Sequence, residues 1–265
     1  MTLVCAPAVL ATHDRRLQPR AQGPKLIWIK ESIVIHSHVA ARLHPHQIVV
    51  VVPAHNEQDR LPACLAGVGE AADRVSVPVT VVVVLDDCTD DSLSVIEPPV
   101  KTLSIAAANV GEARALGFAR TAKGAGGDTW FATTDADSVV PSDWLANQLI
   151  HHRNGAEAVV GTVRVDWHHH SATTRRKYEQ RYGRAGRDEP HGHVHGANLG
   201  IRADAYWRVG GFRPLEREED VDLVDRLERT GARIVWDRSY PVLTSDRTDF
   251  RVTGGFGDYV QDLVG

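Results

Sequence analysis

The chain is short of cysteine, of long apolar runs and of net charge, and each shortage excludes a class of protein. Its 265 residues include three cysteines, Cys5, Cys64 and Cys88. None forms a C-x-x-C pair, which excludes a disulfide scaffold and is typical of a reducing compartment. No apolar run approaches the roughly 18 residues that a membrane-spanning helix requires. The mildly apolar start also lacks the positive segment that opens a secretory signal. We therefore expect a cytoplasmic protein with no membrane span.

The balance of charge and the absence of phosphate loops narrow the function further. Lys and Arg number 30 against 34 Asp and Glu, a formal charge of −4, so no basic field argues for nucleic acid as a partner. There is no G-x-x-x-x-G-K-[ST] loop, and the glycine-rich run at 124–127 precedes a predicted strand instead of joining a strand to a helix. A dinucleotide cradle is therefore excluded. With 43% hydrophobic residues, the chain is long enough to bury a core unaided.

Strand and helix patterns alternate along most of the chain. Residues 48–52 form a continuous β-branched run, as expected for a strand buried on both faces, and a second buried strand is expected at 79–85. Apolar residues at i, i+4 and i+7 predict a helix from Leu61. Further strands are expected at 101–105, 129–134, 158–165, 194–202 and 234–236, and further helices directly after Asp90 and at 111–122, 142–151, 173–184 and 221–230. The alternation predicts an α/β fold with a mainly parallel central sheet flanked by helices.

The chain reads as one folded domain with an appendage at each end. Residues 1–46, punctuated by proline and histidine, are predicted to be an N-terminal extension that is partly flexible. The domain is expected at 47–250. Residues 251–265 contain three glycines and are predicted to be a C-terminal tail.

Carboxylates follow three of the predicted strands. Glu57 comes shortly after the first strand, Asp87 follows the second, and Asp135 and Asp137 follow the strand at 129–134. In open α/β sheets, ligands bind outside the carboxyl ends of the strands, and crowded like charges repel one another. A divalent cation removes that conflict, because Mg²⁺ and Mn²⁺ prefer carboxylate and phosphate oxygens. The sequence therefore predicts a site for a metal-bound diphosphate at this edge.

Five segments resemble the motifs of GT-A-fold glycosyltransferases of family 2. They lie in order between about residues 47 and 247: VVVPAHNE at 50–57, LDDCTD at 85–90, NVGEAR at 109–114, TDAD at 134–137, and the block formed by HGANLG at 195–200, GGF at 210–212 and ED at 219–220. Each motif is weak alone, and together their order is specific. The resemblance implies a Rossmann-like GT-A fold. It also implies transfer of a sugar from a nucleotide-diphosphate donor to an acceptor hydroxyl, with Mg²⁺ or Mn²⁺ and with inversion.

The resemblance also implies roles for single residues. Ala54 and Glu57, with Asp87, would hold the nucleoside, and Arg114 would lie near the diphosphate. Asp135 would contact the ribose or the metal, and Asp137 would ligate the metal. Asp220 would be the general base that deprotonates the acceptor hydroxyl. The same motifs add five further substrate-binding residues: Pro53, Asn109, Gly111, Ala136 and Asn198.

Structural roles and other functions compete with these assignments. Asp86 suits a structural role as well as a functional one, and Arg114 could be one of many exposed arginines. Asp220 lies in a charged run that a helix dipole would favour in a solvated first turn. Two other functions stay open, a sugar-phosphate nucleotidyltransferase and a non-catalytic protein that binds a nucleotide sugar or a metal. The sequence does not indicate the acceptor or the oligomeric state.

Two groups among the 14 histidines invite a metal interpretation. His191, His193 and His195 alternate, so on a strand they would share one face and could hold zinc. No Cys or carboxylate accompanies them at ligand spacing, so we expect loop histidines instead. The consecutive histidines at 168–170 cannot converge on one ion, and we expect a solvated turn there.

Overall fold

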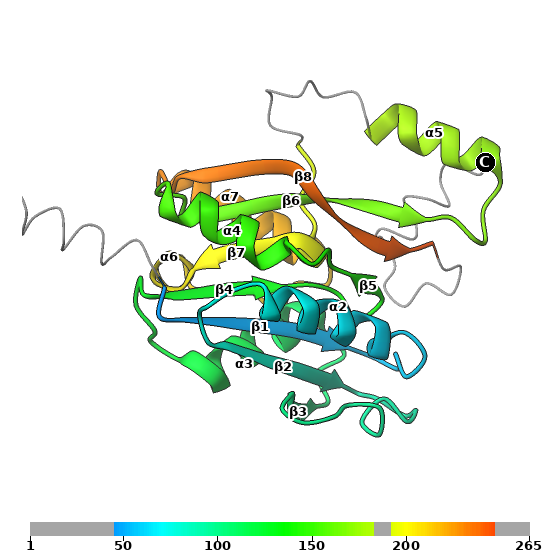
Figure 1. The fold of residues 1–265 in the computed structure, drawn as a ribbon, viewed down its shortest axis with the longest axis horizontal. Coiled ribbons are helices and arrows are strands. Elements are labelled where there is room, and N and C mark those ends of the chain that lie inside the picture. Colours follow the sequence, from blue (N-terminus) through cyan, green and yellow to red (C-terminus); the bar gives the residue numbers. More distant parts are fainter. Residues whose placement is uncertain (1–44, 183–191, 247–265) are drawn as a thin grey trace, which may run out of the picture. The chain divides into compact units, whose positions relative to one another are not determined.

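The computed structural model describes residues 45–182 and 192–246 (Figure 1). By its internal contacts the chain divides into residues 1–39 and 40–265, and all described residues belong to the second unit. The N-terminal extension expected at 1–46, apart from its last two residues, and the tail expected at 251–265 lie outside the described residues. So does the end of the helix expected at 173–184.

Eight strands form one sheet in the order β3-β2-β1-β4-β7-β6-β8-β5. Their bounds are β1 (Gln47–Ala54), β2 (Val79–Asp86), β3 (Lys101–Ile105), β4 (Thr129–Thr133), β5 (Ser138–Val139), β6 (Ala158–Asp166), β7 (Leu199–Arg202) and β8 (Ile234–Ser245). β1 pairs in parallel with β2 and β4, as do β2 with β3 and β6 with β8. β7 is antiparallel to both of its neighbours, and β5 is antiparallel to β8. The predicted α/β class with a mainly parallel sheet is confirmed.

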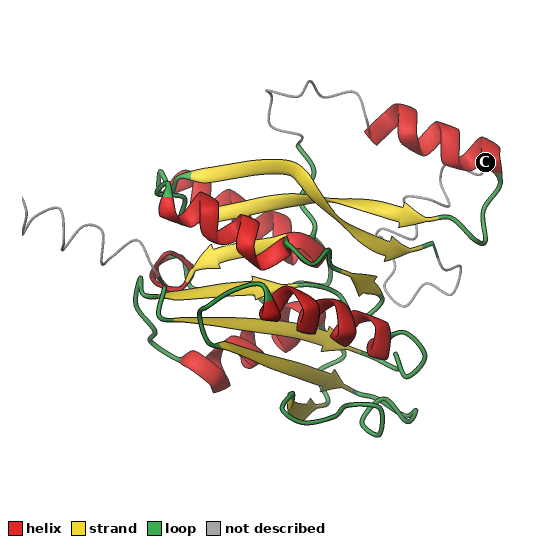
Figure 2. Ribbon diagram, in the orientation of Figure 1, coloured by secondary structure: helices red, strands yellow, loops and turns green. Residues whose placement is uncertain are grey.

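Helices pack on both faces of the sheet (Figure 2). One face carries α2 (Leu61–Asp73) and α4 (Trp144–Arg153), and the other carries α3 (Val110–Ala122), α6 (Ala203–Arg208) and α7 (Glu219–Arg229). β1 shows why the sequence requires both layers. Ile48 and Val50 belong to the core under α2 and α4, whereas Val49 and Val51 belong to the core under α3 and α7. Since successive side chains of a strand point to opposite faces, a continuous β-branched run must be covered twice.

The prediction of a helix directly after Asp90 is wrong, because this segment forms turns. The carboxylate of Asp90 accepts hydrogen bonds from the backbone N–H groups of Gln58 (3.0 Å) and Ser92 (3.0 Å). It therefore ties the segment to the loop after β1 instead of capping a helix. Pro98 and Pro99 follow, and two prolines in succession prevent a helix from extending there.

Two expected strands differ in length from those observed. β8 continues to Ser245, well past the predicted end at 236, because its pairing with β6 shifts register between Gly161 and Val163 and resumes at Val242. The irregular stretch contains Pro241, which hides the alternation. The strand expected at 194–202 begins only at Leu199, because Gly196–Asn198 form a 3₁₀ turn.

The end of β8 is anchored by a single carboxylate. Asp246 Oδ2 accepts hydrogen bonds from the backbone N–H groups of His168 (2.8 Å), His169 (2.7 Å) and His170 (3.3 Å). Its Oδ1 lies 2.7 Å from Nδ1 of His169. Because Asp166 at the end of β6 pairs with Ser245, the turn after β6 is brought beside Asp246. The predicted turn is present, and it is bound to β8. Helix α5 (Ala172–Tyr182) follows directly from it (Figure 1).

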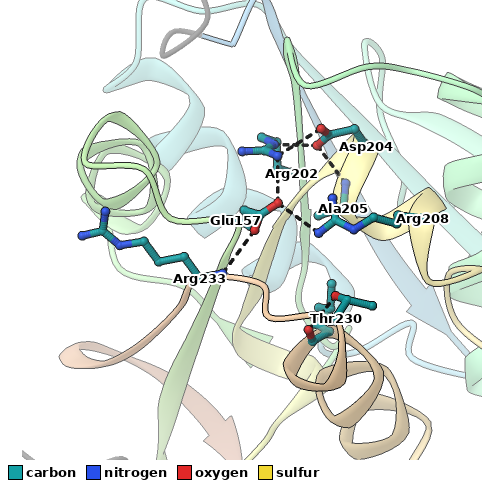
Figure 3. A network of polar contacts seen from close by, with 8 residues as sticks. Glu157, Arg202, Asp204, Ala205, Arg208, Thr230 and Arg233 are labelled. Carbon is teal, nitrogen blue, oxygen red and sulfur yellow. Dashed lines mark hydrogen bonds and ion pairs between the residues drawn. The ribbon is translucent and has the colours of Figure 1, made fainter. Parts of the chain in front are cut away.

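A charged network joins the elements at the opposite edge of the sheet, where β6 begins. Glu157 Oε1 accepts hydrogen bonds from Nη2 of Arg202 (2.8 Å) and of Arg208 (3.0 Å), and its Oε2 accepts one from the backbone N–H of Arg233 (3.2 Å) (Figure 3). Arg202 also donates to Asp204 (2.5 Å). The side chain of Glu157 is 17% exposed. One carboxylate thus connects β6, β7, α6 and the start of β8.

We expect Glu157→Gln to lower the free energy of unfolding by about 1–2 kcal/mol, since it weakens charge-assisted hydrogen bonds in a largely buried position. Urea denaturation measures the change. Asp225→Asn is the matched control, because Asp225 is half exposed and pairs with Arg229 at 3.5 Å, so we expect a loss of no more than about 0.5 kcal/mol. Equal losses in the two variants would contradict a structural role for the Glu157 network.

Candidate functional site

The candidate site lies at the edge of the sheet where the parallel strands end. Ala54 at the end of β1 pairs with Leu85 in β2, and Thr133 at the end of β4 pairs with Val51. β7 runs in the opposite direction, and its first residue, Leu199, pairs with Thr133. The segments that follow β1, β2 and β4 and the segment that precedes β7 therefore meet at one edge. These segments contain most of the residues that the sequence singled out.

The loops after β1 and β2 hold each other in place. Asn56 Oδ1 accepts hydrogen bonds from the backbone N–H groups of Thr89 (2.7 Å) and Asp90 (3.2 Å). The hydroxyl of Ser92 accepts one from the N–H of Glu57 (2.8 Å). Asn56 has φ 54°, a left-handed conformation that Asn tolerates better than most residues. The two loops thus form one unit.

The three residues expected to hold the nucleoside belong to this unit, as does Pro53, a residue expected to bind substrate. Pro53 is half-buried and Ala54 is buried at the end of β1, while Glu57 is only 5% exposed. Asp87, directly after β2, is exposed and has φ 51°. The structure therefore brings the four together on adjacent strand ends, and Asp87 has the most accessible side chain of the four.

Asp86, which the sequence left open, has a structural role. Its buried carboxylate accepts three backbone hydrogen bonds, from the N–H groups of Ala107 (2.7 Å), Ala108 (2.9 Å) and Asn109 (2.8 Å). These amides lie between β3 and α3. Asp86 therefore shapes the loop that leads into α3.

Asn109 and Gly111 join the start of α3 to the loop before α7. Asn109 caps the helix by accepting a hydrogen bond from the N–H of Glu112 (2.8 Å), and its amide donates to the carbonyl of Leu215 (2.9 Å). A Cβ atom on Gly111 would lie 2.2 Å from the carbonyl oxygen of Arg213. Only glycine permits this approach, so the N-x-G pattern packs two loops together at the site.

Arg114 lies at the centre of the site and is only 2% exposed, which excludes the alternative of a solvent-exposed arginine. Its Nη2 donates to Asp135 Oδ1 (2.5 Å) and its Nη1 donates to Glu219 Oε1. The guanidinium lies over the ring of Phe212, with Cζ 5.4 Å from the ring centroid. A Cβ atom on Gly196 would fall 2.3 Å from Nη2. Arg114 therefore occupies space that a side chain at Gly196 would fill.

The carboxylates around Arg114 keep it charged. Burial acts to lower the pKa of the Arg114 guanidinium, but Asp135, Glu219 and Asp220 outweigh it and raise that pKa above its ordinary value. The buried Glu219 and the half-buried Asp135 accept hydrogen bonds from a single planar group, a geometry that suits arginine and not lysine.

The D-x-D segment follows β4 directly, as predicted. Ala136 is buried, while Asp135 and Asp137 are half-buried. The pKa of the buried Cys64 thiol in α2 is raised, first by burial and then by the negative charges of Asp135, Asp137 and Glu57. Cys64 Sγ lies 3.3 Å from the carbonyl oxygen of Asp135, so α2 packs against the D-x-D segment. Within residues 45–182 and 192–246, no three His, Cys, Asp or Glu side chains form a ready metal site.

Asp220 lies in the first turn of α7. Its Oδ2 accepts a hydrogen bond from the N–H of Gly196 (2.7 Å) and its Oδ1 accepts one from the N–H of Val221 (2.8 Å). Burial, and then the charge of Glu219, raise the pKa of Asp220 to about 6, although Arg114 and the two amides act against this shift. This raised pKa lets the carboxylate of Asp220 accept a proton near neutral pH.

Asn198 is held inside the framework. Its Oδ1 accepts a hydrogen bond from the indole of Trp144 (2.9 Å), and its Nδ2 donates to the carbonyls of Thr162 (2.8 Å) and Tyr240 (3.1 Å). The residue is 3% exposed. Both polar atoms of its amide thus connect α4, β6 and β8 behind the site, and the expected substrate contact remains a prediction.

Sequence reasoning missed Glu219, Gly196 and Phe212. In the sequence, Glu219 stands out only as the neighbour of Asp220. In the structure it is buried and paired with Arg114. The signal was present in the sequence, since all three residues lie inside the block that resembles the family. What the sequence could not show is that Arg114, 105 positions before Glu219, would connect them.

Comparison with known proteins establishes the class. The sequence model described as glycosyl transferase family 2 matches residues 49–210, so the chain belongs to this family. The expectations of a GT-A fold and of a glycosyltransferase domain are confirmed. No curated protein matches the chain significantly. No helix among the described residues is long and apolar enough to cross a membrane.

Solved structures of two glycosyltransferases share the fold. S. aureus TarS 1–349 in complex with UDP-GlcNAc superposes with a TM-score of 0.59 and is 13% identical, over 82% of this chain and 65% of that one. The mannosyltransferase PcManGT from Pyrobaculum calidifontis, in complex with GDP-Man and Mn²⁺, superposes with a TM-score of 0.56 and is 19% identical, over 83% of this chain and 66% of that one. The chain therefore spans slightly less than two thirds of the length of either relative. At this identity the likeness shows the fold alone.

We expect Gly196→Ala to lower the free energy of unfolding by about 1–3 kcal/mol, because the new Cβ would displace the guanidinium of Arg114 or the turn itself. Gly69→Ala is the control, since a Cβ there meets nothing within 4 Å. In the middle of α2 that change should stabilise the protein by about 0.5–1 kcal/mol. Urea denaturation measures both, and a neutral Gly196→Ala would contradict the close packing of Arg114.

Proposed function

We propose that the chain transfers a sugar from a nucleotide-diphosphate donor to a hydroxyl of an acceptor, with Mg²⁺ or Mn²⁺ and with inversion at the transferred carbon. The observation that carries the proposal is the arrangement at one sheet edge. Glu57 follows β1, and Asp135 and Asp137 follow the neighbouring strand β4. Asp135 is linked through Arg114 to Glu219, the neighbour of Asp220, and the pKa of Asp220 is raised. The family supports the proposal, as do the UDP-GlcNAc and GDP-Man complexes of the two structural relatives.

The loops after β1 and β2 suit the nucleoside. In the proposed complex, the backbone at Pro53 and Ala54 and the carboxylates of Glu57 and Asp87 meet the base edge and the ribose hydroxyls. Asp135, in the segment after β4, contacts the ribose or the metal in this proposal. Asn109, Gly111, Ala136 and Asn198 complete the proposed substrate-binding residues. Because the two loops are already bonded to each other, little ordering is required when a donor binds.

Asp137 suits a divalent cation. Its carboxylate is half-buried directly before β5, and its Oδ1 lies 3.3 Å from the hydroxyl of Ser138. The described part of the chain contains no complete set of protein ligands. Asp137 and the oxygens of the diphosphate would therefore coordinate the ion jointly. When bound, Mg²⁺ or Mn²⁺ neutralises charge on the nucleoside diphosphate that leaves.

Asp220 suits the role of general base. In the proposed reaction its carboxylate takes the proton of the acceptor hydroxyl while that oxygen forms a bond to the sugar carbon. The bond from this carbon to the diphosphate oxygen breaks, and its electron pair leaves with the nucleoside diphosphate. Attack opposite the leaving group inverts the configuration of the carbon in a single displacement.

The products distinguish this function from the two alternatives. Incubation with UDP-, GDP- and dTDP-sugars and Mn²⁺ should release nucleoside diphosphate, whereas a nucleotidyltransferase releases pyrophosphate. A non-catalytic binding protein would shift in thermal stability with a donor and release neither. If the protein neither binds nor hydrolyses any of these donors, the proposed function is excluded.

We expect the turnover number to fall as pH falls through about 6, because Asp220 must be deprotonated to act as a base, and to level off above that pH. Asp220→Asn should abolish turnover and leave donor binding intact, as measured by product release and calorimetry. Asp225→Asn on the same helix is the control and should keep normal turnover. Unchanged turnover in Asp220→Asn would remove Asp220 from the mechanism.

We expect Mn²⁺ to increase the thermal shift that UDP or GDP produces, and we expect Asp137→Asn to lose most of this increase. Each tenfold loss of affinity corresponds to about 1.4 kcal/mol of stabilisation. Asp128→Asn, which changes an exposed carboxylate at the other end of β4, should retain the full effect. An Asp137→Asn protein that responds to Mn²⁺ like the unmodified chain would exclude Asp137 as a ligand.

A further inference from the structure

We propose that Arg114 is a positioning residue that joins the donor side of the site to the acceptor side. In this proposal Arg114 is not a ligand of the diphosphate. This inference rests on the proposed function for its catalytic meaning. Its structural content is that the guanidinium fixes the start of α7, and with it Asp220, against the end of β4.

The hydrogen bonds of Arg114 lead in two directions. Nη2 reaches Asp135, in the segment after β4, and Nη1 reaches Glu219, in the first turn of α7. Glu219 is adjacent to Asp220 in the chain, and the two share that turn. A displacement of Arg114 would therefore move the backbone that carries Asp220.

The surroundings leave Arg114 a single position. Phe212 lies against the guanidinium, with 5.4 Å from its ring centroid to Cζ, and the backbone of Gly196 lies so close that a Cβ would approach Nη2 to 2.3 Å. The N–H of Gly196 in turn donates to Asp220 (2.7 Å). Arg114 and Asp220 thus pack against the same glycine, which gives a second route from one to the other.

Direct contact with a diphosphate does not fit this environment. Arg114 is 2% exposed, and both terminal nitrogens already donate to carboxylates. A phosphate at the guanidinium would lie beside the negative charges of Asp135 and Glu219, which repel it and are already paired with Arg114.

The charged groups that act on Asp220 come from two packed elements. Glu219 on α7 raises its pKa and Arg114 on α3 lowers it, while the turn before β7 contributes the amide of Gly196. His195 precedes that glycine, and Asp135 is bonded to Arg114. Removing the negative charge of Glu219 should therefore lower the pKa of Asp220, and removing the positive charge of Arg114 should raise it.

The test is an NMR titration of the Asp220 carboxyl, assigned with Asp220→Asn, in the full-length protein and in three variants. In Glu219→Gln we expect the midpoint to fall from about 6 toward the ordinary aspartate value of about 3.9. In Arg114→Gln we expect it to rise. Arg226→Gln is the matched control, since Arg226 is also buried and bonded to a carboxylate, Asp222. In this variant we expect the midpoint of Asp220 to stay unchanged.

Donor binding and turnover complete the test. Arg114→Gln should lower the turnover number by about 10- to 100-fold, as a small displacement of a reacting group does, while the affinity for UDP or GDP relative to the free nucleoside stays unchanged. A selective loss of nucleoside diphosphate affinity with an unchanged Asp220 midpoint would overturn the proposal and make Arg114 a phosphate ligand. If Arg114→Gln does not fold, Glu219→Gln decides alone, and an unchanged midpoint there overturns the proposal. The titration requires no turnover, so it stands even if the proposed transfer reaction is excluded.

Discussion

The ion cluster of Arg114, Asp135 and Glu219 is the constraint on which the rest of the site edge depends. Three buried or half-buried charges are stable together only when each is paired and hydrogen-bonded, because removal of one leaves the others uncompensated. The cluster also dictates its neighbours, since Gly196 must lack a side chain and Phe212 must present a ring face. Three segments far apart in the chain are thereby made to depend on one another.

The order of the strands explains why those segments meet. Parallel strands β1, β2 and β4 deliver their following loops to one edge, and β7 returns antiparallel beside β4, so the segment before β7 reaches the same edge from the other side. Asn198 secures this return by hydrogen bonds to both β6 and β8. The donor and acceptor halves of the proposed site therefore lie next to each other along one edge of the sheet.

The parts of the fold that the sequence predicted are those that local patterns determine. The β-branched run 48–52 identified a strand buried on both faces, and carboxylates placed directly after strands reached the expected edge. The failures are non-local or irregular. Nothing near Asp90 shows that its carboxylate binds the neighbouring loop, and Pro241 conceals a strand that is paired through a register shift. The partners of Arg114 likewise depend on a contact across 105 positions, which no periodicity encodes.

The anchor at Asp246 has a consequence for the helix that leaves the domain at that point. Three consecutive amides of the turn at 168–170 end on this carboxylate, which comes 77 positions after His169. The direction in which α5 departs is therefore set by a residue that the ribosome adds much later. Until that residue is in place, the N–H groups of these three residues lack the acceptor that holds the turn, from which α5 follows directly.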